Sequence, residues 1–466
     1  MHLIHCDQRQ DDAKGLATRV RLASDKALHQ WSAAFFCQAT PGGGKTFLAA
    51  EVAKRLMDLG LIDIALCFSP TKSVAEGIEK TFSFRLQRPF NGTLGSIGHS
   101  LTYQSIQYVP ESYWSSLKNL RVFLVLDEVH HCSGNGTTGN SWGQQVIEKL
   151  QELAVFSFAM SGTPWRSDSL PIVLSRYTDP EGKLMVDYQY SLKQAVADGV
   201  CRSPNIVLVD NERLAVRNGQ GEKAFSSILD LLSQTKTSYQ SVIHNDAAIE
   251  YVLSLACNKL QMIRRTSPRA GALVVAASVS HTLKISQMLR ENFNQSVSVV
   301  SYLHSNPLGE IEHYRSGDSQ WIVSVGMISE GTDIPRLQVC CHLSAAKTEL
   351  YFWQVLGRIL RVTSEPNQEA WLYTFAEPSL IEFSERVEHD IPGCCSIVNV
   401  EDQRRSNSLA QHDGPETSVR LLPRPTENEL MWIEPNESCG LVYPATTLID
   451  EVILGRFKQR VIDVFR

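Results

Sequence analysis

The sequence predicts an α/β protein with two domains, each a mostly parallel β-sheet flanked by helices, followed by a C-terminal extension. At 466 residues the chain is longer than one hydrophobic core commonly supports. Short apolar runs alternate with helix-period segments, as in βαβ units, and the runs are apolar throughout, as in strands covered on both faces. We expect residues 1–200 and 201–380 to form the two domains and residues 381–466 the extension.

The first domain is predicted to begin with a strand, a glycine-rich loop and a helix. Residues 32–40 form an apolar run that ends at the loop. Beyond the loop, Leu48, Val52 and Leu56 recur at the four-residue spacing of a helical face, and Gly60 is expected to end that helix. Another helix is expected at residues 143–153, and further strands are expected at residues 62–68, 122–126 and 156–160.

The second domain repeats this order in outline. Its strands are predicted at residues 205–209, 271–276, 297–302, 321–325, 339–343 and 371–375, with helices between them. Residues 404–427 are polar and contain prolines, which predicts a loop or linker. Residues 446–465 place their apolar side chains on one face of a predicted amphipathic helix. We expect this terminal helix either to pack on the body of the protein or to dock a protein partner.

The composition is that of a soluble globular protein, with 43% hydrophobic and 20% charged residues. No apolar run is long enough to cross a bilayer, and the first residues lack the pattern of a secretory signal, so we expect a cytoplasmic protein without a membrane partner. Eleven scattered cysteines without a Cys-x-x-Cys pair argue against a zinc site and a disulfide framework. A net charge of −6 excludes a globally basic nucleic-acid coat but permits a local groove.

The glycine-rich loop has the residues of a phosphate-binding loop. Residues 39–46 read Ala-Thr-Pro-Gly-Gly-Gly-Lys-Thr between the first strand and the first helix. Glycines let backbone N–H groups turn toward a polyphosphate, Lys45 can reach its β and γ phosphates, and Thr46 can bind Mg²⁺. Ala39 stands where the usual pattern has glycine. The candidate nucleotide-binding residues are Thr40, Pro41, Gly42, Gly43, Gly44, Lys45 and Thr46.

Two carboxylates follow the predicted strand 122–126. Asp127 comes directly at its carboxyl end, where it can hold Mg²⁺, either directly or through water. Glu128 comes next and can polarise the water that attacks a γ phosphate. The sequence therefore predicts an acidic pair that faces the phosphate-binding loop.

Five segments together resemble the motifs of superfamily 2 helicases of the DExH kind. Residues 39–46 resemble motif I, residues 127–130 motif II and residues 161–164 motif III, while residues 329–335 and 354–361 resemble motifs V and VI. They occur in the order of that family and each adjoins an apolar strand or helix. The resemblance implies two tandem RecA-like domains that bind ATP and Mg²⁺ between them.

The resemblance also implies roles for residues of the second domain. Arg358 and Arg361 would be arginine fingers, because a planar guanidinium can contact phosphate oxygens bidentately, and three residues on a helix would place both on one face. Gln354 would belong to the same catalytic motif, and Gly331 with Asp333 would link the nucleotide to the domain interface.

Nucleic acid would cross both domains in this family. Hydroxyls and backbone amides there hold phosphates and read little base sequence. The string Ser-Gly-Thr-Pro-Trp-Arg at residues 161–166 favours DNA over RNA. The candidate contacts are Ser69, Pro70, Thr71, Thr102, Ser278 and Thr332.

Three functions stay open at this point. The chain could be an ATP-driven helicase, a translocase of a restriction or defence complex that does not unwind, or a nucleotide-dependent switch that binds a protein. Gln30 lies closer to Lys45 than the adenine-recognising glutamine of related enzymes, so the base of the nucleotide is open as well.

Overall fold

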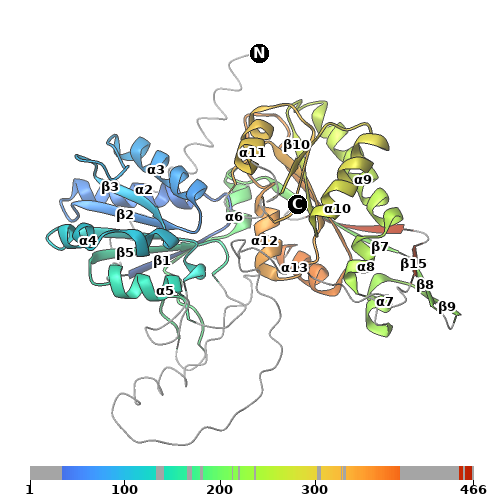
Figure 1. Cartoon of the computed structure of the whole chain (residues 1–466), viewed down its shortest axis with the longest axis horizontal. Coiled ribbons are helices and arrows are strands. Elements are labelled where there is room, and N and C mark those ends of the chain that lie inside the picture. The colour runs from blue at the N-terminus through green and yellow to red at the C-terminus, as the bar shows by residue number, and fades with distance from the viewer. Residues whose placement is uncertain are drawn as a thin grey trace, which may run out of the picture.

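The computed structural model describes residues 34–132, 141–164, 171–178, 182–211, 214–218, 221–235, 238–301, 306–326, 328, 332–388, 451–454 and 457–463. Two α/β domains lie side by side, with helix α6 (Leu192–Ala197) between them (Figure 1). Across these ranges no disulfide links the cysteines, which are buried. None of the helices in the described part combines the length and the hydropathy that spanning a bilayer requires.

The sheet of the first domain has the order β3-β2-β4-β5-β1-β6, and all its neighbouring strands are parallel. The strands are β1 (Ala34–Ala39), β2 (Ile64–Ser69), β3 (Gly98–Thr102), β4 (Val122–Asp127), β5 (Ala154–Ser161) and β6 (Tyr188–Tyr190). The four strands predicted in this domain are present with slightly shifted ends. Strands β3 and β6 were not predicted, because each is short and not continuously apolar.

Helices cover both faces of this sheet. They are α2 (Lys45–Asp58), α3 (Lys72–Leu86), α4 (Glu111–Leu117) and α5 (Ser141–Gln145), with the short turns η1 (Tyr103–Tyr108), η2 (Val129–His131) and η3 (Val146–Leu150). In β4, Phe123 and Val125 pack on the side of α2, whereas Leu124 and Leu126 pack with Trp114 of α4. Strand side chains alternate between faces, so covering both faces explains why β4 is apolar throughout.

The sheet of the second domain has the order β11-β12-β10-β13-β14-β7-β16. Its parallel strands are β7 (Ser203–Asn211), β10 (Gly271–Ala276), β11 (Val297–Val300), β12 (Trp321–Ser324), β13 (Leu337–Leu343) and β14 (Glu369–Phe375). The helices are α7 (Ile228–Gln234), α8 (Tyr239–Ile243), α9 (Asp246–Arg264), α10 (Val279–Glu291), α11 (Pro307–Ser316), α12 (Glu349–Gly357) and α13 (Pro378–Glu388). The predicted fold class, two mostly parallel sheets flanked by helices, is confirmed.

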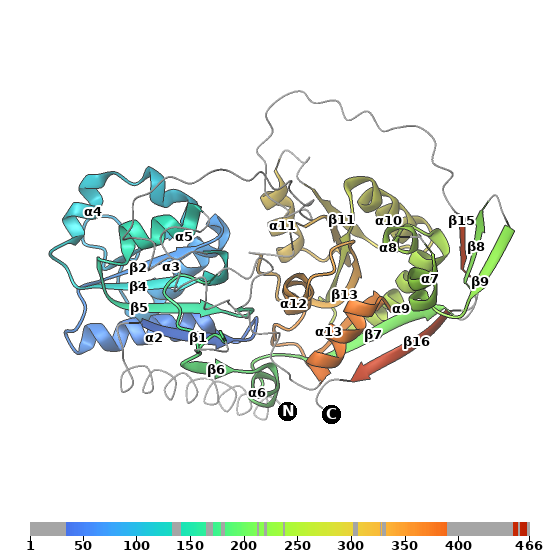
Figure 2. The ribbon, with the colours of Figure 1, turned by 90° about the horizontal axis from the view of Figure 1, so that it is seen from below.

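The predicted terminal helix at residues 446–465 is wrong. Strand β16 (Phe457–Asp463) lies antiparallel to β7 at the edge of the second sheet (Figure 2), and β15 (Glu451–Leu454) pairs with a hairpin of β8 (Leu214–Asn218) and β9 (Gly221–Phe225). In β16, Ile462 is buried and its neighbour Val461 is exposed, which is the period of a strand. The β-branched residues suit a strand, and the free edge of β7 provides its partner. Residues 451–454 and 457–463 therefore do not form the predicted helical docking face.

Candidate nucleotide site at the domain boundary

The phosphate-binding loop connects β1 to α2. Gly42 and Gly44 have φ angles of 83° and 80°, a left-handed backbone that favours glycine. The backbone N–H of Gly43 donates to the carbonyl of Thr40 at 2.9 Å, which closes the turn. Gly44 is the N-cap of α2, so the loop delivers the first-turn N–H groups of a 14-residue helix to the site. This is the arrangement that binds an anion at a helix N-terminus.

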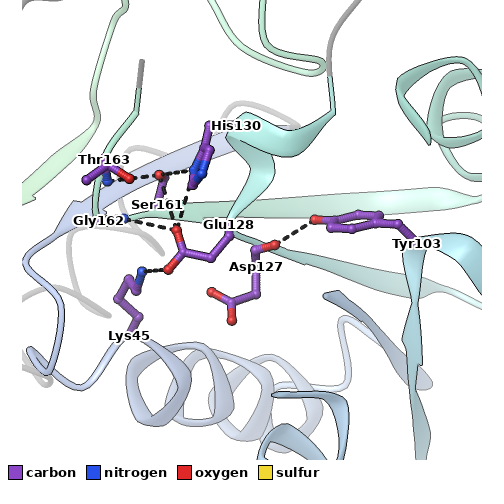
Figure 3. Close-up of polar contacts among 8 residues, drawn as sticks. All are labelled: Lys45, Tyr103, Asp127, Glu128, His130, Ser161, Gly162 and Thr163. Carbon is purple, nitrogen blue, oxygen red and sulfur yellow. Dashed lines mark hydrogen bonds and ion pairs between the residues drawn. The ribbon is translucent and has the colours of Figure 1, made fainter. Parts of the chain in front are cut away.

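Asp127 ends β4 beside this loop (Figure 3). Its side chain is 5% exposed, and its Oδ1 atom has no hydrogen-bond partner among the described residues. Burial raises the pKa of Asp127 to about 6, with Lys45 opposing the shift and Glu128 adding to it. A buried carboxylate oxygen without a partner is costly, and a bound cation would satisfy it.

Glu128 forms an ion pair with Lys45 across the site (Figure 3). Its φ angle of 47° is unusual for a residue other than glycine, and such strain is often found at functional sites. Burial acts to raise the pKa of Glu128, but the charge and hydrogen bond of Lys45, together with the nearby His130 and His131, outweigh it and hold that pKa at about 2. Burial lowers the pKa of Lys45, and Glu128 and Asp127 together raise it above its usual value. Both members of the pair are therefore charged at neutral pH.

The residues of motif III contact Glu128 directly. The Ser161 hydroxyl and the Gly162 N–H donate to Glu128 Oε2, both at 3.4 Å. Ser161 Oγ also lies 2.8 Å from His130 Nδ1 and accepts a hydrogen bond from the Thr163 N–H at 3.1 Å. The end of β5 is thus in contact with the Glu128 carboxylate. Trp165 and Arg166, which extended this motif in the sequence, lie outside the described residues.

Tyr103 contacts the acidic pair, which the sequence did not predict. Its hydroxyl donates to the Asp127 carbonyl at 2.8 Å, and its ring stacks between Phe68 and Trp142. It follows Thr102 at the end of β3, so it connects that strand to the acidic pair. The signal in the sequence was the position of Tyr103, an aromatic residue directly after the candidate contact Thr102.

Residues of motif VI lie against the phosphate-binding loop. A Cβ atom added to Gly357, at the end of α12, would lie 2.5 Å from Pro41 Cβ. A Cβ atom added to Gly42 would lie 3.8 Å from Arg361 Cγ. The structure thus brings the loop of one domain and Arg361 of the other together.

The expectation that one helix carries both arginines is wrong. Helix α12 ends at Gly357, so Arg358 is its C-cap, and Arg361 forms a β-bridge with Cys201. Gln354 remains on α12 and is half-buried.

Both arginines contact the motif V segment. Arg361 forms an ion pair with Asp333, whose Oδ2 atom also lies 3.7 Å from Arg315 Nη2. Arg358 Nη1 donates to the Thr332 carbonyl at 2.5 Å. Gly331 lies outside the described residues. In this arrangement each arginine has a protein partner that a phosphate group could replace.

Three candidate nucleic-acid contacts are helix N-caps. The side chains of Thr71, Thr102 and Ser278 accept hydrogen bonds from backbone N–H groups at the starts of α3, η1 and α10, at 3.3, 3.2 and 3.1 Å. All three lie at or just after the carboxyl ends of parallel strands and are partly exposed. At Thr71 and Thr102 the cap uses the oxygen as an acceptor and leaves the hydroxyl hydrogen for another partner, whereas Ser278 Oγ also lies 3.0 Å from Ser280 Oγ.

Two further candidates do not reach the surface. Ser69 is fully buried, and its hydroxyl donates to the Thr71 carbonyl at 3.3 Å. Thr332 is buried, and its hydroxyl donates to the Ile328 carbonyl at 3.3 Å. Their hydroxyls serve the turns that carry them, whereas Pro70 is half-buried beside Thr71. We therefore set Ser69 and Thr332 aside as side-chain contacts.

Comparisons with known proteins agree with this fold. Residues 20–166 match the family model described as type III restriction enzyme, res subunit. A fragment of a putative HsdR subunit of a type I restriction enzyme from Vibrio vulnificus YJ016 has a TM-score of 0.53 at 15% identity, over 82% of this chain and 67% of that one. The resemblance to superfamily 2 helicases is confirmed. The helicase-type fold consists of tandem RecA-like domains. A second structure with this fold is the ATP-dependent Type ISP restriction-modification enzyme LlaBIII bound to DNA. Its TM-score is 0.50 at 15% identity, over 82% of this chain and 29% of that one.

Relatives of this chain occur in mycobacteria. An uncharacterised protein of Mycobacterium leprae (strain TN) is 28% identical over 392 residues, which is 81% of this chain and 65% of the relative. An uncharacterised protein of Mycobacterium tuberculosis (strain ATCC 25618 / H37Rv) is 27% identical over 374 residues, or 76% of this chain and 60% of the relative. The chain thus spans less than two thirds of the length of either relative.

Proposed function

We propose that the chain is an ATP-hydrolysing motor that moves along nucleic acid, with DNA preferred to RNA. The observation that carries this proposal is the contact of Pro41 and Gly42 with Gly357 and Arg361, because it brings the phosphate-binding loop against the segment of the other domain that carries the arginine. A shared site of this kind lets nucleotide binding and hydrolysis change the relation of two domains. The DNA-bound structural neighbour supports the choice of DNA.

ATP binding would begin with an exchange of ion pairs. Lys45 leaves Glu128 for the β and γ phosphates, and the N–H groups of the loop bind the remaining oxygens. Asp127 and Thr46 would hold Mg²⁺, and the unpartnered Asp127 Oδ1 fits that role. The metal ion would neutralise phosphate charge. In the described ranges no group of three or more His, Cys, Asp or Glu side chains is arranged to hold a metal ion. The phosphates would add ligands to Asp127 and Thr46.

Hydrolysis would use Glu128 as the group that orients water. Once Lys45 has moved to the phosphates, the carboxylate of Glu128 is held by Ser161 and Gly162 and can accept a hydrogen bond from water. Arg361 would exchange Asp333 for the γ phosphate and stabilise the charge of the transition state. Because Ser161 and Gly162 contact Glu128, a movement of Glu128 after loss of the γ phosphate would also move the end of β5.

The direct test is ATPase activity across single-stranded, duplex and forked DNA and RNA. We expect stimulation by DNA, and we expect Lys45→Ala to remove both basal and stimulated activity. Strand separation on the fork would identify a helicase, whereas displacement of a third strand from a duplex without unwinding would identify a translocase. The absence of stimulation by every polynucleotide would contradict the motor and favour a protein-binding switch.

The activity should depend on the protonation of Asp127. Its carboxylate must be deprotonated to hold Mg²⁺, and its pKa of about 6 places that change near neutrality. We expect kcat/KM for ATP to fall as pH drops through about 6. A higher Mg²⁺ concentration should shift the midpoint of this fall to lower pH, because the metal ion competes with the proton for Asp127. Steady-state kinetics from pH 5 to pH 8 at two Mg²⁺ concentrations measure this. If the acidic side of the pH profile did not change with the Mg²⁺ concentration, the titrating group would not be Asp127.

The nucleic-acid face can be tested at Ser278 without loss of its helix cap. Aspartate is as good an N-cap as serine, so Ser278→Asp should preserve α10 while its charge repels phosphate. We expect Ser278→Asp to bind single-stranded DNA roughly tenfold more weakly, or weaker still, at low salt, because charge repulsion removes a phosphate contact. Ser278→Asn keeps the cap without the charge and should bind like the parent. Equal DNA binding by all three proteins would remove Ser278 from the interface.

Contact between the domains can be tested at Gly357. A methyl group there meets Pro41 Cβ at 2.5 Å, and overpacking of this kind costs about 1–3 kcal/mol. Gly357→Ala should therefore lower kcat roughly tenfold or more, while the first domain still binds ATP. Gly77→Ala is the control, since a methyl group at that position of α3 has nothing within 4 Å. Full turnover in Gly357→Ala would show that the contact is not part of the active state.

A further inference from the structure

The connection between the two domains pairs with the segment that carries Arg361. Cys201 and Arg361 form an antiparallel β-bridge, and the Arg202 N–H donates to the Leu360 carbonyl at 2.7 Å. Cys201 also contacts the phosphate-binding loop, because its Sγ atom lies 3.6 Å from the Pro41 carbonyl oxygen. The connection therefore touches both halves of the nucleotide site.

Arg202 fixes this pairing through its side chain. Nη1 donates to the carbonyls of Leu337 at 2.5 Å and Ile359 at 3.3 Å, and Nη2 donates to the Thr363 hydroxyl at 3.3 Å. The acceptors at Ile359 and Thr363 lie on either side of Arg361. A planar guanidinium can reach all of them at once, which a lysine ammonium cannot do with the same geometry.

The burial of this cation is expensive. Arg202 is 1% exposed, and no carboxylate pairs with it in the described part of the chain. Desolvation lowers its pKa to about 10, so the guanidinium stays charged at neutral pH. An apolar side chain would fill the same space without this desolvation cost, so packing alone does not account for an arginine here.

We infer that Arg202 is a positioning residue for Arg361, and that it ties the domain connection to the arginine finger so that both move together when the site closes. The inference rests on the proposed ATPase function. Arg202 would not touch the nucleotide. It would hold the backbone on both sides of Arg361, so that the Arg361 side chain stays beside Gly42 of the phosphate-binding loop.

Arg202→Met tests this inference, because methionine fills much of the space without donating hydrogen bonds. We expect kcat to fall about tenfold or more while KM and the Kd for ATP stay within about threefold, as a misplaced catalytic group affects turnover more than binding. Arg202→Lys should recover part of the rate, and it keeps the test usable if the methionine variant folds poorly. ATP-binding stoichiometry measures the folded fraction, and kcat is calculated per binding site.

Arg336→Met is the matched control. Arg336 is also buried in the second domain, and it donates to the carbonyls of Tyr314, Arg269 and Ser319. None of these acceptors lies on the segment 359–363. Its loss should lower stability without changing kcat per binding site, so a general effect of removing a buried cation would appear in both variants.

A double-mutant cycle separates a positioning role from an independent one. If Arg202 acts through Arg361, then Arg202→Met should slow the Arg361→Ala protein little further. An equal factor in both backgrounds would overturn the inference, and so would a normal kcat in Arg202→Met. A parent protein without ATPase activity would instead contradict the proposed function.

Discussion

Replacing Glu128 by Gln is expected to lower the rate of ATP hydrolysis about 10²- to 10⁴-fold, which is the usual contribution of a positioned general base. ATP should still bind, and somewhat more tightly. In the free protein Lys45 is held by the charged Glu128, and a neutral glutamine would release that lysine to the phosphates. The rate comes from a coupled phosphate-release assay, and the Kd comes from a fluorescent ATP analogue.

A carboxylate far from the site provides the control for this substitution. Glu111 is an exposed residue of α4 that pairs with Lys149, so Glu111→Gln should hydrolyse ATP at the parental rate. If purified, folded Glu128→Gln protein hydrolysed ATP at that rate too, Glu128 could not be the residue that orients water.

The second large effect is expected at Arg361. Removal of an arginine finger lowers turnover by about 10³-fold or more, because the positive charge of the guanidinium stabilises the transition state more than it stabilises bound ATP. Arg361→Ala should therefore reduce kcat far more than it weakens ATP binding. Lys45 and the loop amides lie in the other domain and stay in place. Steady-state kinetics with a parallel binding titration distinguish the two terms.

Arg315→Ala is the matched control for Arg361→Ala. Arg315 also faces Asp333, at 3.7 Å, but it lies on α11 and has no described contact with the phosphate-binding loop. It should change kcat much less. If Arg361→Ala weakened ATP binding with no change in kcat, Arg361 would be a binding residue and not a finger.

The sequence was sufficient where the chemistry is local. Residues 39–46 and the pair Asp127 and Glu128 follow apolar strands, and the carboxyl ends of parallel strands meet at one edge of a sheet. The apolar runs of β1 and β4 therefore located both parts of the site. The continuous hydrophobicity of these strands also identified a sheet covered on both faces.

The sequence was insufficient where distant segments meet. The contact of Cys201 with Arg361 and with Pro41 joins segments 160 residues apart, and no local pattern records it. The apolar spacing of residues 446–465 suits a helix and a pair of short strands alike, and only the edge of β7 decides between them. The hydroxyls of Ser69 and Thr332 resembled surface contacts because burial of a single polar residue is not visible in sequence.

The central claim is that one ATP molecule is held by Lys45 in the first domain and by Arg361 in the second. The structure of the Glu128→Gln protein with bound ATP and Mg²⁺ tests it most directly. The account predicts that the Arg361 guanidinium leaves Asp333 and lies about 3 Å from a γ-phosphate oxygen, with Lys45 on the β and γ phosphates. A bound ATP that Lys45 holds while Arg361 stays paired with Asp333, out of reach of every phosphate, would contradict it.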